Sequence, residues 1–128
     1  IIMNRHLQRQ KTIECLYQHC LLERPLTLIL EDNEFEITQD EGRFVLLNCE
    51  FIEINKEALV EKINDLLQDW TFERLPFVEQ AILLLAVCEL ERKLDEKPVV
   101  IDEAVLLAKE YADDESYKYI NAVLDRYE

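Results

Sequence analysis

Basic side chains cluster at the start of the chain, where they could bind phosphate. Arg5 and Arg9 are four residues apart, and Lys11 follows them. Lys and Arg neutralise phosphate charge, and the affinity gained in this way depends little on nucleotide sequence. Positions 5, 9, 13 and 16 share one face of a helix, so the arginines continue the apolar stripe of Ile13 and Leu16. We predict that these first turns overhang the fold or fray, either as a solvated helix end or as a basic arm that meets phosphate.

A thiol and an imidazole on the same predicted helix have the spacing of a metal-ligand pair. Cys15 and His19 are four residues apart, and the same spacing allows a cysteine–histidine nucleophile pair. The sequence provides neither a second pair of ligands nor an oxyanion site for them. We therefore predict no catalytic residue, no metal and no cofactor, and we expect both side chains to pack in the core.

Motifs for nucleotide or acyl chemistry are missing as well. Gly42 is the single glycine, and one glycine builds neither a P-loop nor G-x-G-x-x-G. No G-x-S-x-G is present. The cysteines stand among apolar residues without C-x-x-C, which is typical of buried, reduced thiols; they are Cys15, Cys20, Cys49 and Cys88. No apolar run suits a membrane helix or a signal peptide, so we expect a cytoplasmic binding module and not an enzyme.

The charge distribution restricts the partners that such a module can bind. The chain has 14 Lys and Arg against 28 Asp and Glu, a net charge of −14. Residues 1–24 hold four basic and two acidic residues, hence +2, whereas residues 25–128 hold ten basic and 26 acidic residues, hence −16. An acidic body repels nucleic acid and suits a basic protein. Any contact with nucleic acid should therefore be local or should need a basic partner.

The fold is organised around one apolar segment, residues 77–90, which predicts a central helix over 76–91. It is too long for a typical strand, it is apolar nearly all round, and Pro76 stands at its start. Helical spacing continues on both sides of it, with Asn4 and Asn55 as predicted N-caps and Trp70 as a predicted core residue. The further helices are expected over 4–22, 26–30, 44–51, 56–69, from Asp102 to Tyr111, and from about 116 onward.

These elements predict an all-α protein of about seven helices, with residues 1–128 as a single domain and no internal repeat. Segment 44–51 could be a strand by composition, and its helical neighbours decide for helix. Residues 31–42 are acidic and are expected to form a loop, with Phe35 and Ile37 tucked in. The last helix should turn its apolar face inward, namely Tyr117, Ile120, Val123, Leu124 and Tyr127.

Four stretches of the C-terminal half together form a pattern that resembles one protein family. The first is W-x-x-x-R-L from Trp70, which includes Arg74. V-E-x-A-I-L-x-L-A-V-x-E-L follows over 78–90, P-V-V-I-D-E-A-V-x-L-A-K-x-Y over 98–111, and Y-I-N-A-V-L-D over 119–125. Near the start, Leu16, Tyr17 and Gln18 resemble the family's L-Y-Q, and residues 3–12 resemble its basic N-terminal arm. These motifs resemble the NusB family of bacterial transcription antitermination factors, whereas residues 25–55 match that family weakly.

The resemblance implies a fold of two small helical bundles and a role in transcription. NusB proteins bind the boxA segment of single-stranded RNA together with NusE, a ribosomal protein, and so help RNA polymerase read through terminators in ribosomal RNA operons. The RNA-binding residues implied for this chain are Arg5, Arg9, Lys11, Lys118 and Tyr119. The partner-binding residues implied are Glu79 and Arg74. RNA polymerase would be contacted indirectly, and a homodimer is a further expected assembly.

Several alternatives stay open at this point. Tyr119 could pack in the core, and Glu79 could be a first-turn carboxylate favoured by the helix dipole. The chain could be a NusB-like interaction domain with little RNA binding. It could also be the RNA-binding portion of a ribosomal RNA methyltransferase, since such enzymes carry a NusB-like domain.

Overall fold

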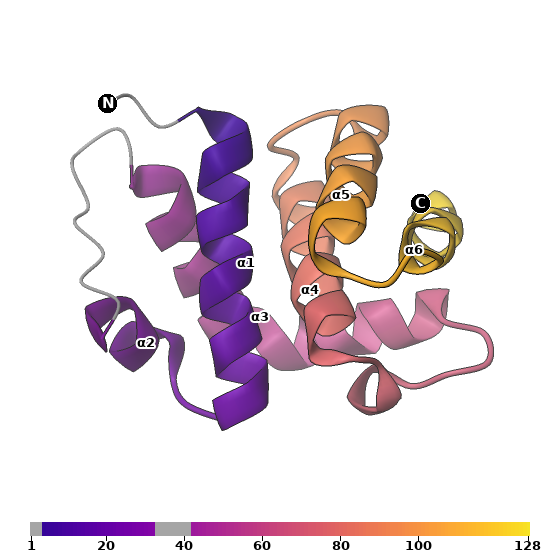
Figure 1. Ribbon diagram of the computed structural model, residues 1–128. Coiled ribbons are helices and arrows are strands. Elements are labelled where there is room, and N and C mark those ends of the chain that lie inside the picture. Colours follow the sequence, from indigo (N-terminus) through magenta and orange to yellow (C-terminus); the bar gives the residue numbers. More distant parts are fainter. Residues whose placement is uncertain (1–3, 33–41) are drawn as a thin grey trace.

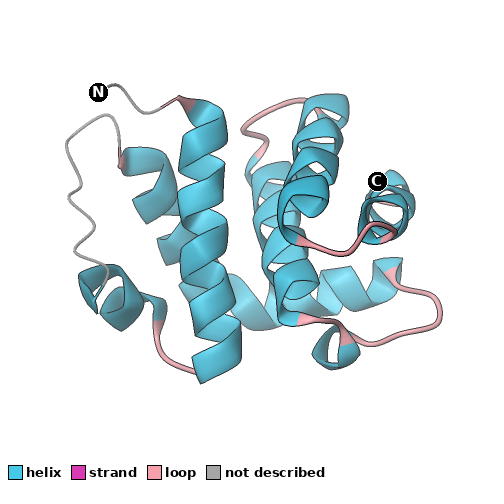
Figure 2. Cartoon of the chain, in the orientation of Figure 1, coloured by secondary structure: helices cyan, strands magenta, loops and turns pink. Residues whose placement is uncertain are grey.

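The structure is a computed structural model that describes residues 4–32 and 42–128, and within these ranges every regular element is a helix. The all-α prediction is therefore confirmed (Figures 1 and 2). The predicted loop residues Phe35 and Ile37 lie outside the described residues. The described elements are α1 (Arg5–Leu22), α2 (Leu26–Asp32), α3 (Arg43–Leu66), the 3₁₀ turn η1 (Phe72–Arg74), α4 (Phe77–Arg92), α5 (Lys97–Tyr111) and α6 (Ser116–Asp125).

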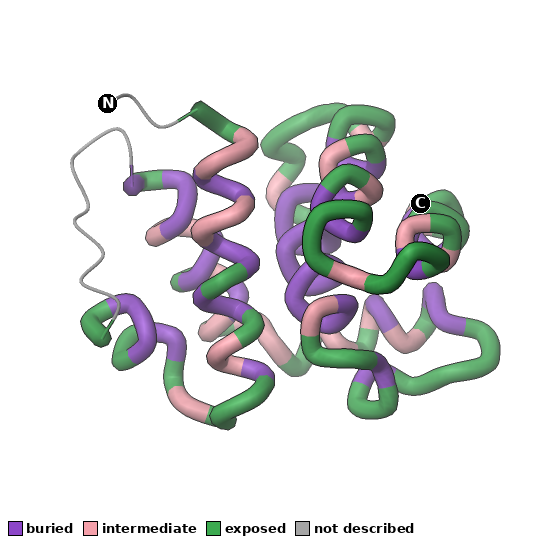
Figure 3. The backbone as a smooth tube through the Cα atoms, in the orientation of Figure 1, coloured by how far each residue is buried: buried purple, intermediate pink, exposed green. Residues whose placement is uncertain are grey.

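Helix α4 is the centre of the fold, as its apolar sequence predicts. It contacts α1, α3, α5 and α6: α1 lies on one side of it, α5 and α6 lie on the other, and α3 passes behind it (Figure 1). Every residue from 79 to 90 is buried (Figure 3). The helix is enclosed because it is apolar nearly all round and other helices must cover each of its faces. No helix of the described part is long and apolar enough to cross a bilayer.

The ends of α1 follow from local hydrogen bonding. Asn4 is the N-cap that the sequence predicts, because its side chain accepts a hydrogen bond from the Leu7 N–H at 2.8 Å. At the other end Glu23 is left-handed, with φ 53°, and its N–H donates to the His19 carbonyl. Helix α1 therefore does not fray at Arg5, and its first turn is fixed in position for the residues discussed below.

Two helix boundaries differ from the sequence-based prediction. Helices 44–51 and 56–69 follow one another without a loop in α3, and the predicted division between them is a kink at Asn55, whose φ and ψ are −109° and 16°. The Asn55 side chain donates to the Phe51 carbonyl at 2.9 Å, so it does not cap a new helix. Helix α5 begins at Lys97 and not near Asp102, because Pro98 needs no N–H partner in a first turn and so starts a helix as readily as it breaks one.

The prediction that Trp70 is a core residue is wrong, since 52% of it is exposed. Helix α3 ends at Leu66, three residues before the predicted end, so Trp70 no longer follows the helical repeat. The space beside α4 is filled by the next apolar residues of the irregular segment, Leu67, Phe72 and Leu75, all of which are buried.

Candidate nucleic-acid interface

Arg9 is the most buried charged side chain of the predicted basic arm, with 3% of it exposed. Its Nε and Nη2 donate hydrogen bonds to the Glu89 carboxylate of α4, at 3.0 and 2.7 Å. Oδ2 of Asp95 lies 3.3 Å from the same Nη2, and Oε2 of Glu103 lies 3.5 Å from Nη1. Burial by itself would lower the pKa of Arg9, but the hydrogen bond and charge of Glu89 outweigh it and raise that pKa.

That Arg9 contacts RNA stays a prediction, and its burial against Glu89 does not favour it. A guanidinium whose donors already bind carboxylates has no free face for phosphate. The sequence argument assumed that an arginine cannot lie on the stripe of Ile13. It can, because Glu89 stands opposite on α4 and is itself only 2% exposed. Arg9 clamps α1 to α4.

Arg5 lies one turn earlier on the same helix and is exposed, as an RNA contact must be. Its guanidinium stacks on the ring of Phe44, 4.4 Å from the centroid, and its Nε donates to the Gln8 side chain at 2.9 Å. No carboxylate among the described residues is ion-paired with it. Arg5 is thus held on the surface with unoccupied donors.

His6 forms a second link from α1, this time to α5. Sequence reasoning did not find this link. Its Nδ1 lies 3.2 Å from Glu103 and its Nε2 lies 3.0 Å from Glu110, both on α5. The hydrogen bond to Glu103 raises the pKa of His6 above 6.5; burial opposes this change and Glu110 adds to it. The neighbouring charge of Arg9, on the same helix, is already paired with Glu89.

The His6 link should depend on pH. A folded-state pKa above the unfolded value means that the stabilisation is complete below pH 6.5 and is lost as the pH rises through the folded-state pKa. We expect His6→Gln to lower the free energy of unfolding more at pH 5.5 than at pH 8.5. Urea denaturation at the two pH values measures this, with Gln10→Ala, one turn further on, as the control. An equal effect at both values would mean that protonation of His6 adds nothing.

The two predicted sites at the start of α6 differ from each other. Lys118 is an exposed cation whose ion pair among the described residues is with Glu115, at 3.1 Å. Tyr119 is half-buried against the core, and its hydroxyl is enclosed without a hydrogen-bond partner in the described part. The ring with cations over it is Tyr117, 4.8 Å from Lys109 Nζ and 5.9 Å from Lys118 Nζ. Tyr117 was predicted to point inward, and it is half-buried.

Lys11 and Arg74 are both on the surface. The Lys11 side chain is 45% exposed and pairs with Glu14 on the same helix, at 3.6 Å. Such exposed pairs hold a side chain weakly, so Lys11 can turn toward another anion. Arg74 is exposed at the end of η1, immediately before α4.

Glu79 is a buried carboxylate at the start of α4, with 8% of the residue exposed. Burial raises its pKa, the charge of Asp113 raises it further, and a hydrogen bond from Ser116 lowers it. These two partners stand at the loop before α6 and in its first turn. Through these contacts Glu79, a predicted partner-binding residue, lies beside the start of α6, the helix that carries Lys118.

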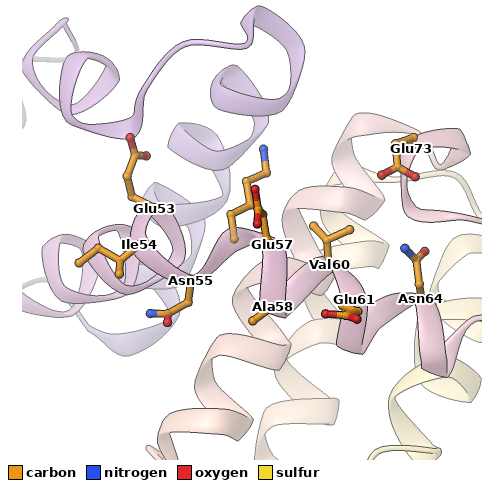
Figure 4. A pocket seen from close by; sticks show the side chains of 10 residues that line it. Glu53, Ile54, Asn55, Glu57, Ala58, Val60, Glu61, Asn64 and Glu73 are labelled. Carbon is orange, nitrogen blue, oxygen red and sulfur yellow. The ribbon is translucent and has the colours of Figure 1, made fainter.

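An acidic hollow of about 920 Å³ lies along α3 at the Asn55 kink and faces η1 (Figure 4). Glu53, Glu57, Glu61 and Glu73 line it, against one cation, Lys56. Four carboxylates repel phosphate, so this hollow is not a candidate for RNA.

The thiols and His19 do not form a reactive site. Nδ1 of His19 lies 2.5 Å from the Arg24 carbonyl, its Nε2 lies 2.8 Å from Lys56 Nζ, and burial lowers its pKa. Burial raises the pKa of Cys15 to about 11, which keeps the thiol protonated and unreactive. Among the described residues no group of three or more His, Cys, Asp or Glu side chains is placed to hold a metal ion.

Comparison with known proteins assigns this arrangement to a family. The sequence profile described as "NusB family" matches residues 6–128. The chain belongs to the NusB family. The matched span begins at His6, directly after Arg5.

Relatives resemble this NusB chain over almost their whole length. The transcription antitermination protein NusB of Bacillus cereus (strain B4264) is 34% identical over 125 residues, covering 95% of each chain. The protein of the same name from Oceanobacillus iheyensis is 33% identical over 126 residues, covering 97% of this chain and 98% of the relative.

Solved NusB structures have the same fold. The T. maritima NusB structure superimposes with a TM-score of 0.87 at 28% identity, covering 98% of this chain and 91% of that one. A chain from the crystal structure of the antitermination factors NusB and NusE in complex with dsRNA gives a TM-score of 0.78 at 25% identity, covering 96% of each chain.

Proposed function

We propose that this chain is a transcription antitermination factor that binds boxA-type RNA together with the ribosomal protein NusE. It would thereby help RNA polymerase read through terminators in ribosomal RNA operons. The observation that carries this proposal is the NusB family match over residues 6–128. A NusB structure with NusE and double-stranded RNA among the similar folds supports both partners. We propose further that residues 1–128 form a single domain without catalytic activity.

The charges of the chain fit a complex better than RNA binding by the protein alone. With Arg9 buried against Glu89, the accessible cations of the basic arm are Arg5, which is exposed, and Lys11, which is partly exposed. Two cations are few against a net charge of −14. A basic partner on the acidic body would remove the repulsion and extend the phosphate-binding surface.

Fluorescence anisotropy of a labelled boxA-type RNA, with and without NusE, tests this function. We expect weak binding by the chain alone and binding about 10- to 100-fold tighter with NusE, for the boxA sequence and not for a scrambled RNA. Arg5→Gln with Lys118→Gln should weaken this binding and flatten its salt dependence, because two phosphate contacts are lost. Lys62→Gln with Lys93→Gln is the control, since it changes the net charge equally.

The burial of Arg9 also favours one competing function, a NusB-like interaction domain that holds NusE without reading RNA. In that case NusE would bind, but the preference for boxA over the scrambled RNA would be absent. The methyltransferase alternative has less support, because relatives matched over 95% and 98% of their own length are named antitermination proteins.

A further inference from the structure

Three arginines line one open pocket, which lies where the starts of α1 and α3 meet the end of α4. Arg5 comes from the start of α1, Arg43 from the start of α3 and Arg92 from the end of α4. The pocket has a volume of about 230 Å³, several times the roughly 30 Å³ that one water occupies in the liquid. Its other walls are Gln8, Phe44, Asn48 and two leucines, and no Asp or Glu of the described residues lines it. We call it the arginine pocket.

The three arginines have no ion pair among the described residues, whereas five of the other eleven lysines and arginines have one. Arg9, Arg24, Lys11, Lys62 and Lys118 each contact a carboxylate. Arg43 is exposed and contacts no carboxylate in the part of the chain that the structure describes. Three guanidinium groups around one pocket repel each other, and an anion between them would remove that repulsion.

The pocket is also built in a fixed geometry. The Phe44 ring supports Arg5 at 4.4 Å. Nη1 of Arg92 donates to Asn48 Oδ1 at 3.1 Å. Asn48 is fully buried, and its own Nδ2 donates to the Phe44 carbonyl at 2.8 Å, so it cannot turn away. A guanidinium held in this way loses little conformational entropy when it binds.

The start of α3 adds a weaker attraction for anions. Gly42, the N-cap of this 24-residue helix, has no side chain to form a capping hydrogen bond with its first N–H groups. Its positive dipole end lies beside Arg43 and Phe44, which line the pocket. Planar guanidinium forks together with backbone N–H groups are the donor set that suits phosphate oxygens.

We propose that the arginine pocket binds a backbone phosphate of the RNA, with Arg43 and Arg92 as phosphate-binding residues beside Arg5. This proposal rests on the proposed function and extends the RNA surface from the basic arm onto α3 and α4. RNA is favoured over other anions because Arg5 belongs both to the basic arm and to the pocket. The RNA strand would then pass over the end of α4 as well as along α1.

The test is RNA binding with NusE present, by anisotropy over a series of salt concentrations. Arg43→Gln and Arg92→Gln should each weaken binding about 3- to 10-fold and reduce the slope of log K against log salt by about 0.7. Lys93→Gln is the matched control: it removes the same charge from the next residue, but it does not line the pocket, so it should weaken binding less than twofold. Arg92→Gln removes the hydrogen bond to Asn48, so thermal unfolding is needed to show whether it lowers stability. Arg43→Gln removes no such bond.

RNAs with a single uncharged methylphosphonate linkage locate the contact. At one linkage, neutralisation should weaken RNA binding by the wild-type chain but not by Arg43→Gln. The reason is that the neutral linkage and the substitution remove the same interaction. If no linkage behaves in this way, or if Arg43→Gln matches Lys93→Gln, the pocket does not bind the strand. Weakening by Arg5→Gln alone would then leave the proposed function standing. If the wild-type chain binds no RNA even with NusE, both proposals are overturned. In that case, NMR shifts of the Arg43 and Arg92 Nε resonances on addition of inorganic phosphate would indicate a site for a free anion.

Discussion

Replacement of Arg9 by Met should destabilise this protein by about 3–5 kcal/mol, which is a large part of the stability of a small domain. The substitution leaves the Glu89 carboxylate, 2% exposed, without the guanidinium that binds it at 2.7 and 3.0 Å. Asp95 and Glu103 lose the same partner. The cost arises because an unpaired charge is left buried, and not because the ion pair itself contributes that much.

Urea denaturation at pH 7 measures this loss, with two control variants. Arg5→Met, on the same helix but exposed, should change the free energy of unfolding by about 1 kcal/mol or less. Arg9→Met combined with Glu89→Met should recover most of the loss, since both buried charges are then gone. A stable Arg9→Met variant with weakened RNA binding would contradict the clamp and restore Arg9 as an RNA contact.

Most of the fold could be predicted because it follows from the periodicity of single helices. The apolar segment 77–90 predicts α4 to within one residue of its observed ends, since a helix that is apolar all round has one place in a protein. The errors fall where two segments interact. Trp70 keeps the spacing of a core residue, but α3 ends too early for that spacing to apply.

The candidate site was harder to predict for the same reason. Arg5 and Arg9 are equivalent in the sequence, and only the position of Glu89, 80 residues further on, makes one a buried clamp and leaves the other exposed. The arginine pocket joins Arg5, Arg43 and Arg92 from three helices, and no spacing within one helix predicts it. A local signal was available for His6. It lies near two basic residues in a chain rich in glutamate, so an ion pair with a glutamate could have been expected.

Replacement of Glu79 by Gln should weaken NusE binding by at least about 2 kcal/mol, or roughly 30-fold, if Glu79 contacts this partner. Loss of one member of a desolvated charge pair has a cost of this size. The isolated protein should respond differently. Burial and Asp113 raise the pKa of Glu79, so its contribution to stability is greatest below the unfolded-state value and declines as the pH rises through the folded-state pKa. At pH 7 the neutral amide should therefore leave stability within about 1 kcal/mol of wild type, the small loss at the helix dipole being offset.

Two measurements on the same variant separate these effects. Titration calorimetry with NusE gives the affinity, and urea denaturation at pH 4 and pH 7 gives the stability. Glu73→Gln is the matched control, because Glu73 is exposed on η1 and loses the same charge. Equal weakening by both variants would indicate a long-range effect of the acidic body. Wild-type affinity for Glu79→Gln, together with lower stability at pH 7, would show that Glu79 serves the first turn of α4 and not the partner.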